Sequence, residues 1–365
     1  MMKIKHSWRR LPFSTRLDIP THYFGIDEQE IRRIRAISDS KTKLIESARL
    51  QYELYGDIHN DLTVWIAGYA SDATIRSRFG SMLSLRNMIY PPPDTSHLKP
   101  SIMDIKRRIS IPDIYNEDLA EEVGIHLGDG NLFIETHKDY TKSYQYSIHG
   151  NLLNETQYHR EWIYSLLKKL YNYSAYSVCR DDKNLISTFC KSKLVVEFKS
   201  KILGLPIGSK KIAQIPLFIM EHEELQKRCL IGIFDTDFSL NKYGLSGSLT
   251  SLKVIKQMSY ILKQQKIKHV VNITRDLGRI AIPKDGTMSI FEEWKMHNSK
   301  HLSKYQLYKE FGIHIPFSTT TERQAVLLGK LDARKLKKLN LKKPHLKDMV
   351  SIYGHERTCS YLLKT

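Results

Sequence analysis

The chain has 365 residues, 41% of them hydrophobic, so it is long enough for two domains and can bury a core, which excludes a disordered protein. Its 57 Lys and Arg residues against 39 Asp and Glu residues give a formal net charge of +18, which indicates a polyanionic partner, with nucleic acid the first candidate. The four cysteines form no CxxC pair and no apolar run resembles a secretory signal or a membrane helix, so we expect no structural zinc, no membrane and a cytoplasmic location.

Residues 1–90 are predicted to form a helical N-terminal region. Apolar residues recur at three- and four-residue spacing over 27–37 and 41–55, and a further helix is expected over 72–88. The three prolines at 91–93 exclude helix and central strand, so we predict a linker over residues 91–110.

The next segment, residues 111–220, begins with a helix that Asn116 can cap and that ends at Asp129-Gly130. Two strands, a helix with an apolar side, two more strands and a last helix follow. The expected strands are 131–136, 143–149, 175–180 and 185–190, and the longest expected helix is 155–171.

The same order of elements recurs in residues 221–316. A helix from about 223 ends at Asp237, and the later helices are expected over 252–265 and 289–296. The expected strands are 238–242, 245–249, 269–275 and 279–282. The duplication predicts an α+β protein, a monomer of two pseudo-symmetric αββαββα halves. Residues 317–365 form a basic extension with interleaved leucines, which either lies on DNA or packs on the body as a solvated helix.

The two helices that end in an aspartate can be aligned. Gly124 then falls opposite Gly232, Gly128 opposite Thr236, and Asp129 opposite Asp237. Small residues four apart let two helix backbones approach closely, so both carboxylates are expected to meet where the helices end. Two carboxylates beside the free carbonyls of helix ends form a hard-oxygen site suited to Mg²⁺. The competing interpretation is that each aspartate only caps a helix-to-strand turn.

The two helix ends also resemble a known pair of motifs. Residues 123–130 (VGIHLGDG) and 230–238 (LIGIFDTDF) resemble the two LAGLIDADG motifs of single-chain homing endonucleases. Shorter segments, at 111–112, 192–193, 205–208, 215–216 and 300–305, resemble archaeal-type members of that family. The resemblance covers about residues 111–315.

The resemblance implies a saddle-shaped, intron-associated enzyme that cuts both strands of double-stranded DNA at a specific site, using Mg²⁺ or Mn²⁺. Carried over residue by residue, Asp129 and Asp237 become the catalytic metal ligands. The carbonyls of Gly128 and Thr236 are weaker candidates.

Two departures from the family pattern weaken the expectation of cleavage. Phe238 stands where a glycine usually follows the second acid, and a phenylalanine adopts positive φ only at a cost. The stretches 147–151 and 246–250, where members often carry a lysine, have none. His149, Lys300 or Lys304 could supply the missing basic group.

Alternation along the strands predicts which residues face DNA. Tyr144, Tyr146 and Ile148 are expected to point inward. Short polar side chains and arginine suit base edges in the major groove, whereas lysines suit phosphates. The expected base contacts are Ser143, Gln145, Ser147, His149, Asn241, Asn272, Thr274 and Arg279, and the expected phosphate contacts are Lys142, Arg180 and Lys242.

Two rival functions remain open. The first is a nucleic-acid binder on the same fold, either an RNA maturase with intron RNA as its partner or a regulator; retained binding without cleavage would mark it. The second is a hydrolase of a small phosphorylated substrate, which needs an enclosed pocket and which the duplicated open sheets argue against.

Overall fold

The computed structural model describes residues 95–137 and 141–341 and a few separate residues between 45 and 89. The chain divides into two units, Met1–Pro92 and Pro93–Thr365. The helices predicted over 27–37, 41–55 and 72–88 lie mostly outside the described residues, as do residues 342–365 of the predicted basic extension. In the described part, no helix is long and apolar enough to span a bilayer.

The first half follows the order predicted from the sequence. Helix α8 (Glu117–Asp129) is capped by Asn116, whose side chain accepts a hydrogen bond from Leu119 N, and the helix leads directly into β1. The remaining elements are β1 (Gly130–Thr136), β2 (Lys142–Asn151), α9 (Leu152–Gln157), the π-helical segment η3 (Tyr158–Ile163), α10 (Tyr164–Tyr171), β3 (Tyr176–Arg180), η4 (Asp181–Lys183), β4 (Leu185–Cys190), α11 (Lys193–Glu197) and η5 (Phe198–Ile202). The strands form one antiparallel sheet in the order β1-β2-β4-β3.

The second half repeats this plan with the sheet order β5-β6-β8-β7. Its elements are α13 (Glu223–Asp237), β5 (Phe238–Asn241), β6 (Gly244–Leu249), α14 (Leu252–Gln264), β7 (Val270–Ile273), β8 (Gly278–Pro283) and α15 (Lys284–Glu293). Helix α15 begins five residues before the helix predicted over 289–296. Gly286 lies inside its first turn, where a Cβ would come within 3.1 Å of an Ile282 methyl carbon, so packing accommodates this glycine in the helix.

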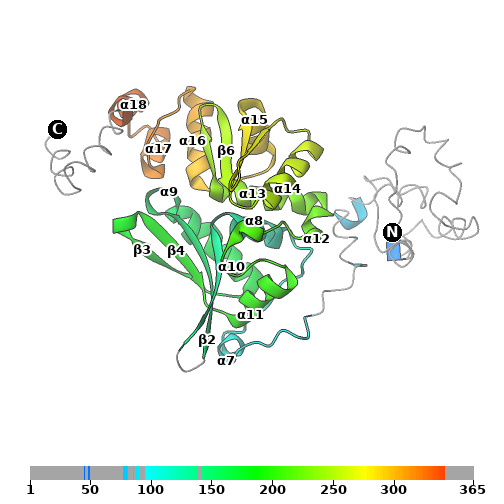
Figure 1. Cartoon of the computed structure of the whole chain (residues 1–365). Helices are drawn as coiled ribbons and strands as arrows, with labels where there is room; N and C mark the ends of the chain where they lie inside the picture. The colour runs from blue at the N-terminus through cyan, green and yellow to red at the C-terminus, as the bar shows by residue number, and fades with distance from the viewer. Residues whose placement is uncertain are drawn as a thin grey trace, which may run out of the picture. The chain divides into compact units, whose positions relative to one another are not determined.

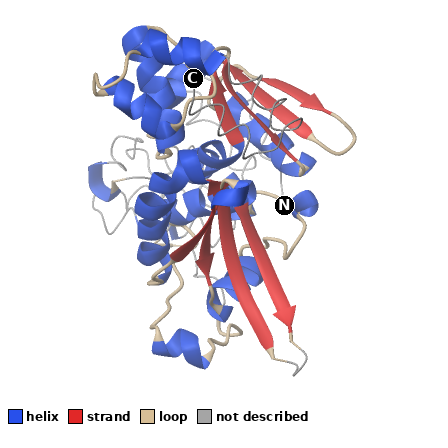
Figure 2. Ribbon diagram, turned by 90° about the vertical axis from the view of Figure 1, so that its left-hand side faces the viewer, coloured by secondary structure: helices blue, strands red, loops and turns tan. Residues whose placement is uncertain are grey.

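Helices α8 and α13 lie side by side at the centre, with one sheet on either side of the pair (Figure 1). The strands of the two sheets diverge from this pair (Figure 2). Gly124 and Gly232 face each other, as the sequence predicted: a Cβ on Gly124 would lie 2.0 Å from the Cys229 carbonyl oxygen, and one on Gly232 would lie 2.1 Å from the Glu121 carbonyl oxygen. The close approach of the two backbones therefore requires glycine at both positions.

Segments outside the two halves also pack on them. Part of the linker predicted over 91–110 is in fact the short helix α7 (Ile102–Lys106), which Ser101 caps. The Asp104 carboxylate is buried and accepts a hydrogen bond from Leu194 N, and this contact anchors α7 to the first half. In the sequence, two short helices connect the halves: η6 (Lys210–Ile212) and α12 (Leu217–Met220).

The C-terminal helices are α16 (Ser299–Phe311), α17 (Thr320–Leu327) and α18 (Ala333–Leu341). Leu336 of α18 packs in a cluster with Leu307, Ile315 and Val326, while Lys335, Lys337 and Lys338 are exposed. The described part of the basic extension is therefore packed on the body through its apolar side. Its lysines remain available to a polyanion.

Candidate functional site

Asp129 and Asp237 line one cavity of about 440 Å³ at the ends of α8 and α13. Burial raises the pKa of Asp129 to about 7, and the negative charges of Asp237 and Glu155 add to the rise. Burial also raises the pKa of Asp237. Ionisation of either acid therefore lowers the stability of the folded protein, and a bound cation would offset this loss for both.

A lysine lies beside each helix end. Lys210, from η6, donates a hydrogen bond from Nζ to the carbonyl of Gly128. Lys300, from the first turn of α16, has its Nζ 3.4 Å from the carbonyl oxygen of Thr236. Their positive charges lower the pKa of both Asp129 and Asp237. The two carbonyls that the sequence offered as weaker metal ligands thus already have an ammonium partner.

Two lysines therefore lie near the aspartates although the strand ends have none. Lys300 was predicted as a candidate, whereas Lys210 was missed, because the three-residue 3-10 helix η6 is too short for periodicity to assign a side-chain direction. Lys304 lies one turn further along α16 and lines a different cavity, next to Tyr305 and His314. His149, the remaining candidate, does line the cavity of the aspartates.

Glu155 holds Lys300 in place from the opposite half. Its carboxylate is 4% exposed, and Oε1 accepts hydrogen bonds from Lys300 Nζ at 2.7 Å and from Asn298 Nδ2 at 2.9 Å. Oε2 accepts from Asn151 N at 2.6 Å. The corresponding residue of the second half, the fourth after its helix cap, is the buried Ile255, so within the described residues no carboxylate holds Lys210 from that position. The two halves are therefore not equivalent at their lysines.

Glu155→Gln is expected to lower the free energy of unfolding by about 3 kcal/mol, because it leaves the largely buried Lys300 ammonium without its carboxylate. Denaturant unfolding measures this. Glu292→Gln is the matched control: its partner Lys309 is exposed, so a change within about 0.5 kcal/mol is expected. Equal effects of the two variants would contradict the role given to Glu155.

The expected backbone cost of Phe238 does not arise, because its position requires no positive φ. Phe238 has φ −97° and ψ 160°, and Gly130, at the matching position, has φ −80° and ψ 155°, so neither half needs positive φ. The Phe238 ring packs on Gly247, its partner in β6, where a Cβ would lie 2.3 Å from the ring. In the first half the arrangement is reversed: the glycine, Gly130, lies on the strand that follows the helix, and the large side chain, Ile148, lies on its partner strand.

The register of the first sheet places five of the predicted DNA contacts on one face, opposite the buried Tyr146 and Ile148. They are Ser143, Gln145, Ser147 and His149 of β2 and Arg180 of β3. Ser147 is a correction. It is 2% exposed, and its hydroxyl lies 3.2 Å from His149 Nε2, so it is covered and supports His149.

The second sheet likewise gathers predicted contacts on its exposed face. They are Asn241 of β5, Asn272 of β7 and Arg279 of β8, followed by Thr274, whose hydroxyl closes the turn after β7. The two exposed faces meet at the aspartates, because Asn131, His149 and Ser248 line the same cavity. Lys142 and Lys242 lie instead on the opposite side of their strands, at the strand ends, and their contact with phosphate stays a prediction.

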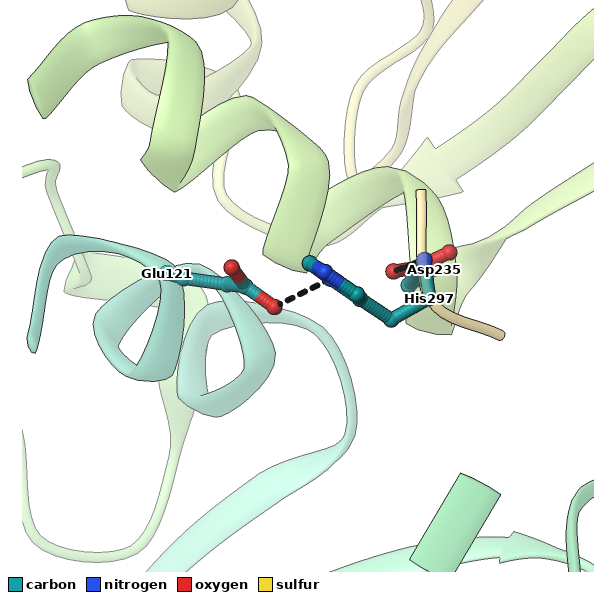
Figure 3. A group of neighbouring side chains, drawn as sticks. All are labelled: Glu121, Asp235 and His297. Atoms are coloured by element: carbon teal, nitrogen blue, oxygen red, sulfur yellow. Dashed lines mark hydrogen bonds and ion pairs between the residues drawn. The ribbon is translucent and has the colours of Figure 1, made fainter. Parts of the chain in front are cut away.

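A second group of polar residues, which the sequence did not single out, lies between the halves on α8, α13 and the segment before α16. Glu121, Asp235 and His297 each offer a metal-ligating atom, and these atoms lie within 4.8 Å of one another. His297 Nδ1 is 2.9 Å from Glu121 Oε1 (Figure 3). Burial raises the pKa of Asp235 to about 7, and the Glu121 charge adds to the rise.

The contacts of this group are an ion pair and hydrogen bonds that join segments of the two halves. Arg228 Nη2 lies 2.8 Å from Glu121 Oε2, and Trp162 Nε1 donates to Glu121 Oε1 at 2.7 Å. Both Asp235 oxygens accept backbone N–H groups, from His297 and Asn298. The carboxylates thus already have a cation and several donors, which disfavours a metal there.

Comparison with known proteins gives similar structures but no similar sequence family: no family model and no curated protein matches the chain. Among the solved structures, I-DmoI in complex with DNA and Ca is similar at 12% identity and a TM-score of 0.39, over 48% of this chain and 87% of that one. The N-terminal LAGLIDADG domain of DUF199/WhiA is similar at 15% identity and a TM-score of 0.32, over 49% and 81%. A point mutant of I-SmaMI is similar at 11% identity and a TM-score of 0.37, over 62% and 96%. These structures include proteins of the family that the two sequence motifs resemble.

Proposed function

We propose that this chain is a site-specific endonuclease for double-stranded DNA that holds divalent metal between Asp129 and Asp237. One observation carries the proposal: two carboxylates from matched positions of the two halves line the same cavity, where the exposed faces of both sheets meet. A duplicated protein that presents one acid per half suits a substrate with two strands, each of which has a bond to be cut. We also propose that it acts as a monomer in the cytoplasm.

The residues of the site fit Mg²⁺ or Mn²⁺. Both ions prefer carboxylate oxygens, and burial is the main reason why the pKa values of Asp129 and Asp237 are raised, so a cation bound beside them would stabilise their charged forms. The bound metal would activate water and stabilise the departing oxygen. Lys210 and Lys300 supply positive charge beside the scissile phosphates, where negative charge develops during attack.

The exposed sheet faces provide the DNA-binding surface of the proposal. Gln145, His149, Asn272 and Arg279 present side chains that suit base edges, and the net charge of +18 supplies phosphate contacts. Affinity for a DNA duplex is expected to fall roughly 10³-fold or more between 50 and 200 mM salt, as for proteins that make 6–10 phosphate contacts. Fluorescence anisotropy over a salt series measures this, and an affinity that does not change with salt would contradict the proposed surface.

A second candidate, binding of DNA or RNA without cleavage, is favoured by the two lysines. The Lys210 and Lys300 ammonium groups lie at the helix-end carbonyls, where they can balance the carboxylates without a metal. Incubating the full chain with a randomised duplex library and Mg²⁺, and then sequencing both the retained duplexes and the free ends, separates the two functions. A common cut site supports the endonuclease. A common bound sequence with no new ends supports the binder.

A further inference from the structure

A small cavity of about 30 Å³ in the second half, whose lining does not include Asp129 or Asp237, brings several basic side chains together. Lys242, Lys284, Lys304 and His314 line it, and no Asp or Glu does. It lies between the helix-packed face of the second sheet, represented by the buried Leu240, and helices α15 and α16. Burial and the neighbouring Lys304 charge lower the pKa of His314, so the positive charge at this cavity comes from the three lysines. Lys242 and Lys284 are exposed, and only Lys304 is partly withdrawn from water, which makes an anionic partner favourable for it.

Lys304 is half-buried, whereas Lys242 and Lys284 are exposed. Among the described residues it has neither a hydrogen bond nor an ion pair. Burial lowers its pKa to about 7, and the neighbouring charges of Arg323 and Lys300 lower it further, while Glu155 acts in the opposite direction. Arg323 is itself buried, and in the described region it donates hydrogen bonds only to uncharged oxygens. Positive charge therefore lies behind the cavity as well as around it.

The mouth of the cavity is also suited to an anion. Lys284 and Lys242 are exposed there, and Lys284 Nζ is held 4.3 Å from the centre of the Tyr308 ring. Lys284 is the first residue of α15, a helix of ten residues whose N-terminus has no side-chain cap, so its first N–H groups can also face an anion. Thr287, three residues after Lys284 in the same helix, also lines the cavity.

We propose that this cavity binds a phosphate group. One oxygen enters beside Lys304, and the other oxygens lie at the mouth between Lys242 and Lys284. The phosphate belongs either to a nucleic-acid backbone or to a free phosphate ion or ester. Both sources provide a phosphate group, whose negatively charged oxygens accept hydrogen bonds from ammonium groups. The site is separate from Asp129 and Asp237, and its existence does not depend on the proposed endonuclease activity.

The test uses the full chain and two variants, Lys304→Met and Lys284→Met. Replacing sodium chloride by inorganic phosphate at matched ionic strength is expected to raise the melting temperature of the wild type by about 3 °C more than that of either variant. Lys168→Met, which removes an exposed lysine of α10, is the control and should keep the full rise. In chloride, Lys304→Met should melt no lower than the wild type, because it removes a desolvated charge, and the exposed Lys284→Met keeps the test valid if Lys304→Met fails to fold.

A second arm measures the affinity of the same proteins for a duplex oligonucleotide over a salt series. If the phosphate is part of DNA, the slope of log affinity against log salt should fall by about 0.9 in the two variants and not in the control. If the ligand is a free phosphate, the slope stays unchanged while the thermal rise in phosphate is lost. Either result supports the phosphate site and shows whether the phosphate belongs to DNA or is free in solution. The proposal is overturned if the variants match the wild type in both arms.

Discussion

Asparagine in place of Asp129, or of Asp237, is expected to abolish DNA cleavage while the fold is retained. Asparagine keeps the shape of the side chain and one carbonyl oxygen, but it removes the negative charge that holds a divalent cation. A loss of at least about 10³-fold in rate is expected, on the scale of removing one preorganised electrostatic group from an active site. The cleavage assay uses the target duplex recovered from the library.

The same variants have a thermal signature that a capping role would not give. The folded pKa of Asp129 is about 7, above its ordinary value of 3.8, so without metal its ionisation destabilises the folded state progressively between about pH 4 and pH 7. Asp129→Asn removes this penalty, so in the absence of metal it should melt at or above the wild type at pH 8 and match it near pH 4. Mg²⁺ should stabilise the wild type and not the variant.

Asp182→Asn, at an exposed position in η4, is the matched control and should leave both cleavage and melting unchanged. A different pattern would show that the aspartates only cap their turns. In that case Asp129→Asn and Asp237→Asn would melt lower than the wild type by the same amount with and without Mg²⁺, and the wild type would gain nothing from the ion.

Alanine in place of Gly124 is expected to lower the free energy of unfolding by about 3 kcal/mol. The added Cβ would lie 2.0 Å from the Cys229 carbonyl oxygen and 3.0 Å from the Gly232 Cα, and these are backbone atoms that move only if α8 and α13 separate. Because the same helix pair places Asp129 beside Asp237, cleavage should fall as well, even under conditions where the variant remains folded.

Gly286→Ala is the control for this substitution, since it is also a glycine within a helix. Its added Cβ meets two side-chain methyl groups, at 3.1 and 3.2 Å, and the Lys268 carbonyl oxygen only at the ordinary contact distance of 3.5 Å. Alanine also has the better helix propensity, so the expected change is within about 1 kcal/mol. Chemical denaturation of both variants measures the difference. If Gly124→Ala is as stable as Gly286→Ala, the two helices do not pack as closely as described.

The features that the sequence predicted correctly are those with a regular spacing. Alternating strand residues and the matched pair Gly124 and Gly232 each depend on a fixed geometric repeat, so the order of elements and the facing glycines follow from it. Helix α7 was missed because prolines nearby outweighed the cap that Ser101 provides. Phe238 was misjudged because its partner across the strand pair, Gly247, is known only once the register is known.

The parts of the site that the sequence did not predict depend on contacts between distant segments. Lys210 contacts Gly128 at the end of α8, which lies 82 positions earlier in the chain. Glu155 and Lys300 are separated by 145 positions. Nothing in the local pattern of either residue indicates its partner. Glu155 resembles any acid in the first turn of a helix until the tertiary fold places it beside α16.

The most direct measurement of the central claim is Mn²⁺ binding by the full chain, followed by electron paramagnetic resonance without DNA. The wild type and Asp182→Asn are expected to show saturable binding, and Asp129→Asn and Asp237→Asn are expected to lose most of it, because each removes one of the two charged ligands. Binding in the wild type should strengthen as pH rises through about 7, since Mn²⁺ must displace the proton that the raised pKa of Asp129 retains. A wild type that binds no Mn²⁺, or variants that bind it as tightly as the wild type, would contradict a metal site between Asp129 and Asp237.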